Sequence, residues 1–137
     1  MLENGLYLGA DSDRARHLEA FALVLERSGA DVRSKFGRTL LHDIVASRGG
    51  LTADDRRTYA TLMLDAGARL DVRDEMLKST PLGWACRWGR IELVTLFLDR
   101  GADAREPDAE PWATPMAWAI KKERTDVIEE LRRRGHP

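Results

Sequence analysis

Few side chains in this 137-residue chain have a type and a spacing that could support chemistry. The histidines are His17, His42 and His136, and Cys86 is the one cysteine. A structural zinc ion takes about four nitrogen, sulfur or oxygen ligands, and a nucleophilic cysteine needs a base beside it. Neither arrangement can be assembled from neighbouring positions, and the chain has no glycine-rich motif of the kind that cradles a phosphate. The sequence therefore predicts no catalytic residue, no metal site and no cofactor.

His42 is the residue on which an enzymatic alternative would depend. A small enzyme or ligand carrier would use His42 with Asp43 and Asp55, in a pocket near residues 48–55. General acid–base catalysis requires a partnered base, and the sequence offers no defined partner for this one. We therefore expect His42 to make a structural hydrogen bond near the start of its own helix. Cys86 is expected to be buried as a small apolar residue.

Composition argues against nucleic-acid and membrane partners. The 22 basic and 23 acidic residues give a net charge of −1, so the chain has no overall attraction to nucleic acid or to an anionic membrane. The run Arg132–Arg134 lacks interleaved aromatic residues and is expected to close a helix. No stretch approaches the roughly 20 apolar residues that span a bilayer, and the amino terminus lacks a secretory signal pattern. Together with the single cysteine, these features predict a cytoplasmic protein.

The elements that would position any site are indicated by two phrases that recur in step. One phrase begins with glycine, at intervals of 38, 34 and 34 residues, at Gly29, Gly67, Gly101 and Gly135. The other begins with threonine, at intervals of 41 and 34 residues, at Thr39, Thr80 and Thr114. Threonine caps the free N–H groups at a helix start, and glycine supplies the left-handed residue that ends a helix. The chain is therefore expected to consist of repeated pairs of short helices, each pair connected to the next by a polar loop.

The third unit carries the most complete pattern, with Thr80-Pro81-Leu82, Ala85, Gly89, Glu92-Leu93-Val94 and Gly101-Ala102-Asp103. In these residues the chain resembles the ankyrin-repeat family, whose unit of about 33 residues carries a T-P-L-H-x-A signature. The resemblance extends over roughly residues 11–135. It implies an all-α fold, an ankyrin-repeat solenoid of stacked helix-turn-helix units with β-turn finger loops.

We expect residues 1–137 to form a single ankyrin-repeat domain. Its degenerate first unit spans about 1–33, with a long helix from 11–13 to Ser28, and the other units span about 34–72, 73–106 and 107–137. The second unit carries extra residues within 48–55, where Thr52 and Asp55 resemble a capping box that starts its second helix. The last helix, near 125–132, has three apolar residues in eight, against six in residues 91–98. This predicts a terminal cap that completes the array.

The resemblance implies that a partner contacts the concave side of the stack, which is formed by the fingers and by exposed positions late in each first helix. Large apolar residues occupy several of these positions, at Phe36, Met76, Leu77 and Trp88. Basic residues flank them, at Arg38, Arg87, Lys121 and Lys122. Interfaces are enriched in Trp and Arg anchors with charged residues at the rim, so we expect these eight residues to bind a partner. The alternative for Leu77 and Trp88 is packing on neighbouring fingers.

The other tryptophans fall into two groups. Trp84 and Trp118 are 34 residues apart and are expected to pack between first helices. Trp112 replaces the finger glycine of its unit, where it either shields the last finger or touches a partner.

The predicted function is a non-catalytic module that binds another protein through its concave face. A standard interface takes about 800 Å² from each partner, an area that three units can offer. Two roles stay open: an inhibitor or immunity protein that neutralises a toxin or effector, as some ankyrin-type immunity proteins do, and a signalling or scaffold adaptor subunit. We expect the free protein to be a monomer that binds neither nucleic acid nor membrane.

Overall fold

The computed structural model describes residues 35–47 and 51–135, which form helices and loops but no β-strand. Six α-helices follow one another in these residues: α2 Leu40–Val45, α3 Ala53–Asp65, α4 Pro81–Trp88, α5 Ile91–Asp99, α6 Pro115–Lys121 and α7 Thr125–Arg133. Two short 3-10 helices, η1 Lys35–Gly37 and η2 Pro111–Ala113, precede α2 and α6. The predicted first unit lies outside the described residues. None of the described helices is long and apolar enough to cross a membrane.

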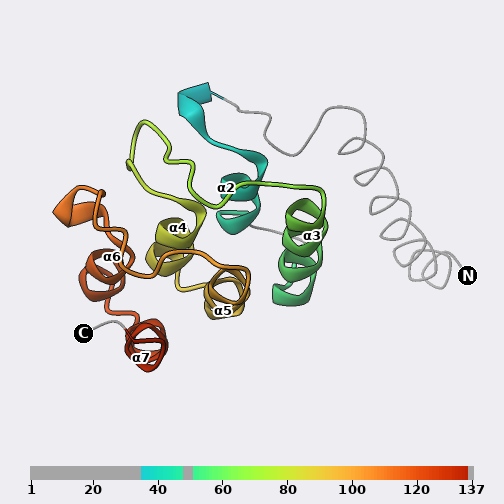
Figure 1. Ribbon diagram of the computed structural model, residues 1–137. Helices are drawn as coiled ribbons and strands as arrows, with labels where there is room; N and C mark the ends of the chain where they lie inside the picture. The colour runs from blue at the N-terminus through green and yellow to red at the C-terminus, as the bar shows by residue number, and fades with distance from the viewer. Residues whose placement is uncertain (1–34, 48–50, 136–137) are drawn as a thin grey trace, which may run out of the picture.

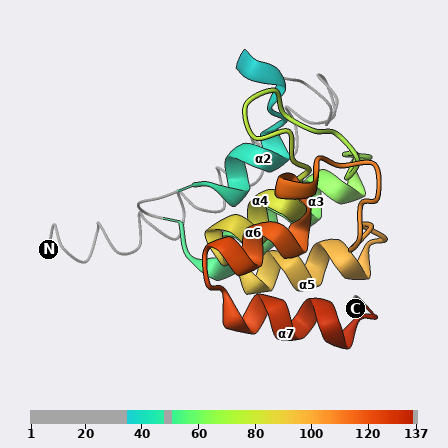
Figure 2. The same cartoon turned by 90° about the vertical axis from the view of Figure 1, so that its left-hand side faces the viewer.

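The helices form two layers (Figure 1). Helices α2, α4 and α6 make an inner layer, and α3, α5 and α7 make an outer layer, with contacts between neighbours in each layer and within each pair. The finger segments, which are η1, the loop before α4 and the loop containing η2, extend away from the outer layer (Figures 1 and 2). The described residues therefore confirm the predicted all-α stack of helix-turn-helix units with projecting fingers. We call the surface formed by the fingers and the inner layer the inner face.

Threonine caps start the inner helices, as the sequence predicts. The side chains of Thr39, Thr80 and Thr114 each accept a hydrogen bond from the backbone N–H three residues later. Helices α4 and α6 also have proline in the first turn, whereas α2 gains a second cap because Nδ1 of His42 accepts from the backbone N–H of Thr39. Each such cap stabilises its helix by about 1 kcal/mol.

The capping box predicted in the extended second unit is confirmed. The Oγ1 atom of Thr52 accepts from the backbone N–H of Asp55 at 3.0 Å, and the Asp55 carboxylate accepts from the backbone N–H of Thr52 at 3.1 Å. Helix α3 therefore begins at Ala53, and the extra residues lie in the connection between α2 and α3. Residues 48–50 of that connection lie outside the described part of the chain.

Glycines in the left-handed conformation end the helices where the spacing predicts. Gly67 and Gly101 follow the outer helices with φ of 99° and 97°, and Gly89 turns α4 into α5 with φ of 69°. A Cβ atom on Gly89 would lie 2.9 Å from the Arg124 side chain. Glycine adopts this backbone conformation without strain, and any larger residue would also have to displace the Arg124 side chain; one unit later, Glu123 takes the left-handed conformation with φ of 56°.

The hydrophobic core lies between the two layers and is continuous from α2 to α7. Fully buried side chains come from both layers, including Leu41, Leu82, Phe97 and Leu131. Cys86 is also fully buried, as predicted. Helix α5 buries four of its nine residues, whereas α7 buries only Val127 and Leu131 and leaves a polar outer side. The last helix therefore has the polar, solvent-exposed side that a terminal cap requires.

Candidate protein-binding surface

Two tryptophans of the inner layer form the base of the candidate surface. Trp84 of α4 and Trp118 of α6 are buried. The Nε1–H group of Trp84 donates to Oδ1 of Asp74 at 2.9 Å, and that of Trp118 donates to Oγ of Ser79 at 2.8 Å. A buried indole whose N–H group is satisfied is held in one orientation. Trp84 also meets the His42 ring of α2 edge-on at 4.9 Å, which confirms that the tryptophans pack between inner helices.

Ser79 connects these rings across three units. Its backbone oxygen accepts a hydrogen bond from Nε2 of His42 at 2.9 Å, while its Oγ atom accepts from Trp118 and donates to the Leu77 oxygen at 2.7 Å. Ser79 has no exposed surface. One buried residue therefore fixes the relative positions of α2, α4 and α6 beneath the inner face.

The Arg87 guanidinium lies against two indole rings above this base. Its Cζ atom is 4.5 Å from the ring centroid of Trp88 and 5.2 Å from that of Trp118. Trp88 in turn stacks on Trp84, with centroids 5.0 Å apart and ring planes 26° apart. Each cation–π contact stabilises the arrangement by about 0.5–2 kcal/mol. The structure thus brings together Arg87 and Trp88, both predicted to bind a partner, and adds Trp118 from the next unit.

Helix α6 adds a second cation and a further aromatic ring. Nζ of Lys121 lies 5.6 Å from the Trp118 centroid, and the Trp112 ring meets Trp118 edge-on at 6.1 Å. Trp112 is still 48% exposed. It therefore shields Trp118 with one edge and leaves about half of its own surface open on the inner face. Lys122, which follows α6, is exposed.

The fingers present two of the predicted apolar residues to solvent. Phe36 is 42% exposed and Met76 is 64% exposed. Their fingers are adjacent, because the backbone N–H of Glu75 donates to the Phe36 oxygen at 2.8 Å. The Asp74 carboxylate holds the second finger by accepting from the backbone N–H groups of Met76 and Leu77 at 3.0 and 2.7 Å.

Two other predicted residues are already engaged within the chain. Leu77 is half-buried and packs against the core, and so does Trp88, so the packing alternative applies to both residues; Trp88 alone also contacts Arg87. Arg38 forms an ion pair with Asp43, with Nε and Oδ1 3.1 Å apart. Any contribution of Arg38 to a partner therefore competes with an existing pair.

His42 and Cys86 have structural surroundings. The His42 ring accepts from Thr39 through Nδ1 and donates to Ser79 through Nε2, which is the structural role predicted for it. Burial lowers the pKa of His42, and hydrogen bonding to Ser79 offsets part of this effect. Burial raises the pKa of the Cys86 thiol, so this group stays protonated and unreactive. Within residues 35–47 and 51–135, no group of three or more His, Cys, Asp or Glu side chains could hold a metal ion.

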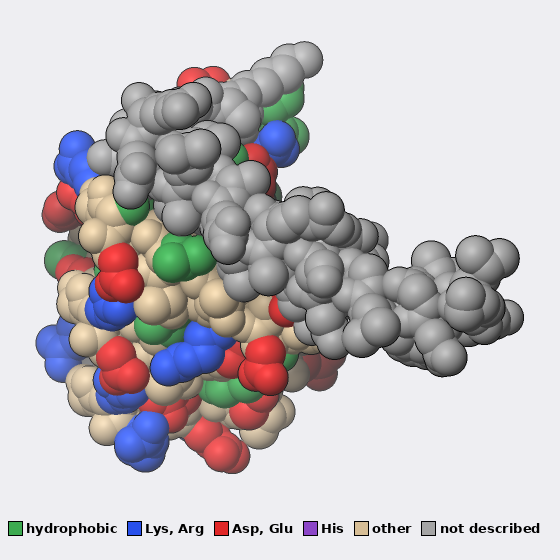
Figure 3. Space-filling view, turned by 90° about the vertical axis from the view of Figure 1, so that its right-hand side faces the viewer, with side chains coloured by type: hydrophobic (Ala, Val, Ile, Leu, Met, Phe, Trp, Pro, Cys, Tyr) green, Lys and Arg blue, Asp and Glu red, His purple; other side chains and the backbone are tan. Residues whose placement is uncertain are grey.

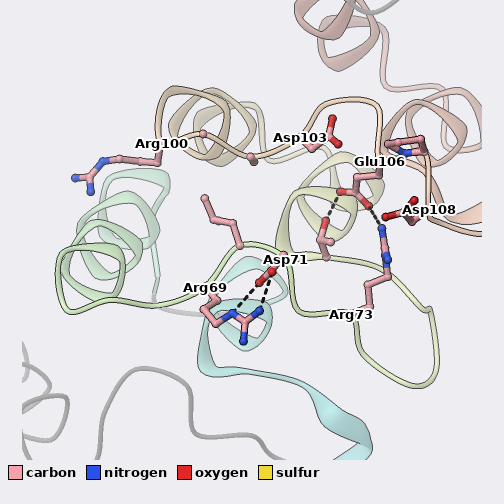
Figure 4. Close-up of a pocket in the computed structure, with 12 residues that line it drawn as sticks. Arg69, Asp71, Arg73, Arg100, Asp103, Glu106 and Asp108 are labelled. Atoms are coloured by element: carbon pink, nitrogen blue, oxygen red, sulfur yellow. Dashed lines mark hydrogen bonds and ion pairs between the residues drawn. The ribbon is translucent and has the colours of Figure 1, made fainter.

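A separate cleft of about 650 Å³ lies between the loops that follow α3 and α5 (Figure 4). Its charged side chains are held mainly by one another. Arg69 donates two hydrogen bonds to Asp71, at 2.9 and 2.8 Å, while Glu106 accepts from Thr80 and forms an ion pair with Arg73. Burial raises the pKa of the Glu106 carboxyl. The fully buried His42 does not line this cleft, so it is not the pocket that the enzymatic alternative requires.

Many charges of the outer layer are already paired within the chain. Ion pairs join α3 to α5 and α5 to the end of α7, with N–O distances of 3.4 Å for Arg56–Glu92, 2.9 Å for Arg100–Asp65 and 2.7 Å for Arg134–Asp99. A view of the stack from the side of α3 shows acidic and basic side chains interspersed (Figure 3). Arg133 and Arg134 also pair with Glu130, which agrees with the structural interpretation of the arginine run. The outer layer is thus mixed and polar, whereas the inner face combines exposed apolar rings with cations.

Two features of the inner layer were missed in the sequence prediction, which is local. It assigned Trp118 to packing and did not foresee that this ring also holds Arg87 and Lys121. It also omitted Ile120, which is 56% exposed. The 34-residue repeat could have flagged Ile120, because it places this residue one unit after Cys86, whose helix is covered by a following inner helix.

Comparison with known proteins gives one finding. A family described as "Ankyrin repeats (3 copies)" matches the chain over residues 10–108 and again over residues 53–136. These matches include every helix described above. No curated protein matches the chain significantly.

Proposed function

Because this chain belongs to the ankyrin-repeat family, whose repeats generally act as protein–protein interaction modules, we propose that it is a non-catalytic module that binds a partner protein through its inner face. The observation that supports this face is the Arg87 guanidinium, which is held against the rings of the half-buried Trp88 and the buried Trp118. Tryptophan and arginine are the residues most often found as binding hot spots. The proposed anchors are Arg87 and Trp88.

The remaining predicted residues surround these anchors. Phe36 and Met76 contribute exposed apolar surface on the fingers, and Lys121 and Lys122 contribute charge at the end of α6. An apolar centre with a charged rim is the usual composition of a specific interface. The outer layer is a weaker candidate for the binding surface. A partner bound there would have to break the ion pairs or remove them from water, and either change costs free energy.

The biological role within this proposal is inhibition of a bound protein, such as a toxin or effector, and the alternative is a signalling or scaffold adaptor. The protein would act as a monomer in the cytoplasm, which is consistent with a single, buried cysteine. The two roles differ in what binding does to the partner. An inhibitor abolishes the activity of its partner, whereas an adaptor leaves that activity intact and brings a third protein to it.

The proposal is tested with a partner that co-purifies from the native host, is identified by mass and is then purified. Its affinity is measured by calorimetry for the wild-type chain and for Trp88→Ala and Arg87→Glu. Each change removes a central anchor and is expected to weaken binding by about tenfold or more, which corresponds to roughly 1.4 kcal/mol.

Arg132→Glu is the matched control for the charge reversal, because Arg132 is exposed on the outer helix α7. It should bind the partner with wild-type affinity. If the two inner-face variants fold normally and also keep wild-type affinity, the inner face is not the binding surface.

A further inference from the structure

The Arg87 side chain makes no hydrogen bond within the described part of the chain, although it is held in place. Its Nε atom is buried and has no hydrogen-bond partner. Its two terminal nitrogens form no hydrogen bond either, but they are not fully buried. The terminal N–H groups therefore face solvent, and the whole guanidinium keeps its donors unused. By contrast, Arg90 and Arg124, which precede the outer helices, donate to backbone oxygens at the ends of neighbouring inner helices.

The position of Arg87 is fixed from both its side chain and its backbone. Trp88 and Trp118 flank the guanidinium at 4.5 and 5.2 Å. The backbone oxygen of Arg87 accepts a hydrogen bond from Nε of Arg124 at 3.2 Å, which anchors the end of α4. A long side chain that is already ordered loses little conformational entropy when it binds, and flanking rings reduce the water around its charge.

Arg87 also lies in a locally cationic region. Lys121 approaches the same Trp118 ring at 5.6 Å, and Lys122 follows at the end of α6. Acidic residues lie in the finger before α6, at Glu106, Asp108 and Glu110, and in the turn after it, at Glu123. None of them forms an ion pair with Arg87.

We propose that Arg87 is the position on the inner face that receives a carboxylate, and that the partner presents an Asp or Glu side chain within an exposed, partly apolar segment of its chain. This inference rests on the proposed function and adds the chemistry of the partner. The planar guanidinium binds a carboxylate through two parallel hydrogen bonds, and such charge-assisted bonds are among the strongest in proteins. The apolar neighbours of the acidic residue contact Trp88 and the exposed ring of Trp112.

The experiment is a selection of random short peptides on the full-length protein, followed by binding measurements on synthetic peptides. The expected peptides share an Asp or Glu next to an aliphatic or aromatic residue. Replacing that acid by its amide should weaken binding by about tenfold or more, as expected for a charge-assisted hydrogen bond. On the variant Arg87→Gln, the acidic and amide peptides should bind equally, whereas on Arg132→Gln the wild-type difference should remain.

The outcomes separate this inference from the proposed function. Selected peptides that lose binding on Trp88→Ala but carry no acidic residue overturn the carboxylate site and leave the inner face as the binding surface. Peptides that bind Trp88→Ala and Arg87→Gln as tightly as the wild-type chain, or a selection that enriches no peptide, overturn both. Displacement of the peptides by an oligothymidine, or a clear preference for phosphoserine over Glu, would replace the acidic polypeptide by a phosphate ligand and overturn the inference.

Discussion

The buried hydroxyl of Ser79 provides a sharp test of how the units are coupled. Replacing Ser79 by Ala removes the acceptor of the Trp118 indole N–H, which is 2.8 Å away, and the hydrogen bond to the Leu77 oxygen. The Trp118 side chain is only 4% exposed, so water cannot replace the lost acceptor. A buried donor left without a partner costs about 1–3 kcal/mol, and we expect the free energy of unfolding to fall by this amount.

The change is measured by urea unfolding, followed by far-UV circular dichroism and by tryptophan fluorescence. Trp118→Phe removes the donor from the other side, so the double variant should lose less stability than the sum of the single variants. A coupling of about 0.5–3 kcal/mol is typical of residues in direct contact. The loss of stability in Ser79→Ala should also lower the thermal midpoint of unfolding.

Ser47→Ala is the matched control, because the Ser47 hydroxyl donates to the nearby Ile44 oxygen at 2.7 Å and joins no other unit. It should cost less than about 1 kcal/mol, since its groups are only half-buried. The reasoning is refuted if Ser79→Ala costs no more than Ser47→Ala, or if the effects of Ser79→Ala and Trp118→Phe are additive.

Three further predictions concern stability. Burial lowers the pKa of His42 below its usual 6.5, so the unfolded chain takes up a proton before the folded chain does as the pH falls. The free energy of unfolding should therefore decrease as the pH falls below about 6.5. His42→Gln should flatten this pH dependence in urea unfolding between pH 7.5 and 5. Burial raises the pKa of the Glu106 carboxyl, so its ionised form opposes folding at neutral pH. Glu106→Gln should therefore raise the thermal midpoint of unfolding at pH 7. An equal increase in the midpoint at a pH below the usual pKa of 4.5 would contradict this explanation. Gly89→Ala should cost about 1–2 kcal/mol because of φ 69° and the displaced Arg124 side chain. Gly101→Ala should also destabilise the chain, through backbone strain alone, because φ is 97° and the added Cβ would meet nothing within 4 Å; a variant with wild-type stability at either position would contradict this.

The repeated architecture could be predicted from the sequence because its signals are local. Thr80 with Pro81 starts a helix through its own backbone geometry, and Gly101 ends one through its own φ. The capping box of Thr52 and Asp55 is likewise complete within four residues. Such signals do not depend on what packs nearby, so their positions in the sequence are sufficient to predict where the helices begin and end.

The details of the inner face could not be predicted because they depend on contacts between units. Arg87 and Trp118 are 31 positions apart, and only the side-by-side packing of α4 and α6 places the guanidinium against that ring. The same holds for Ser79, which forms hydrogen bonds with His42 of the preceding unit and with Trp118 of the following one. For Leu77 the sequence leaves partner contact and packing open, and only the structure, in which this side chain packs against the core, favours packing. Helix-pair periodicity gives the position of a residue along the stack and leaves its side-chain direction open.

The central claim, that a partner binds the inner face, is tested most directly by nuclear magnetic resonance. The chain has four tryptophans, and each gives a separate indole N–H signal. On addition of the purified partner, the signals of Trp88 and Trp112 and the backbone amides at the ends of α4 and α6 should shift. Shifts confined to amides of α3, α5 and α7, with these indole signals unchanged, would contradict the account.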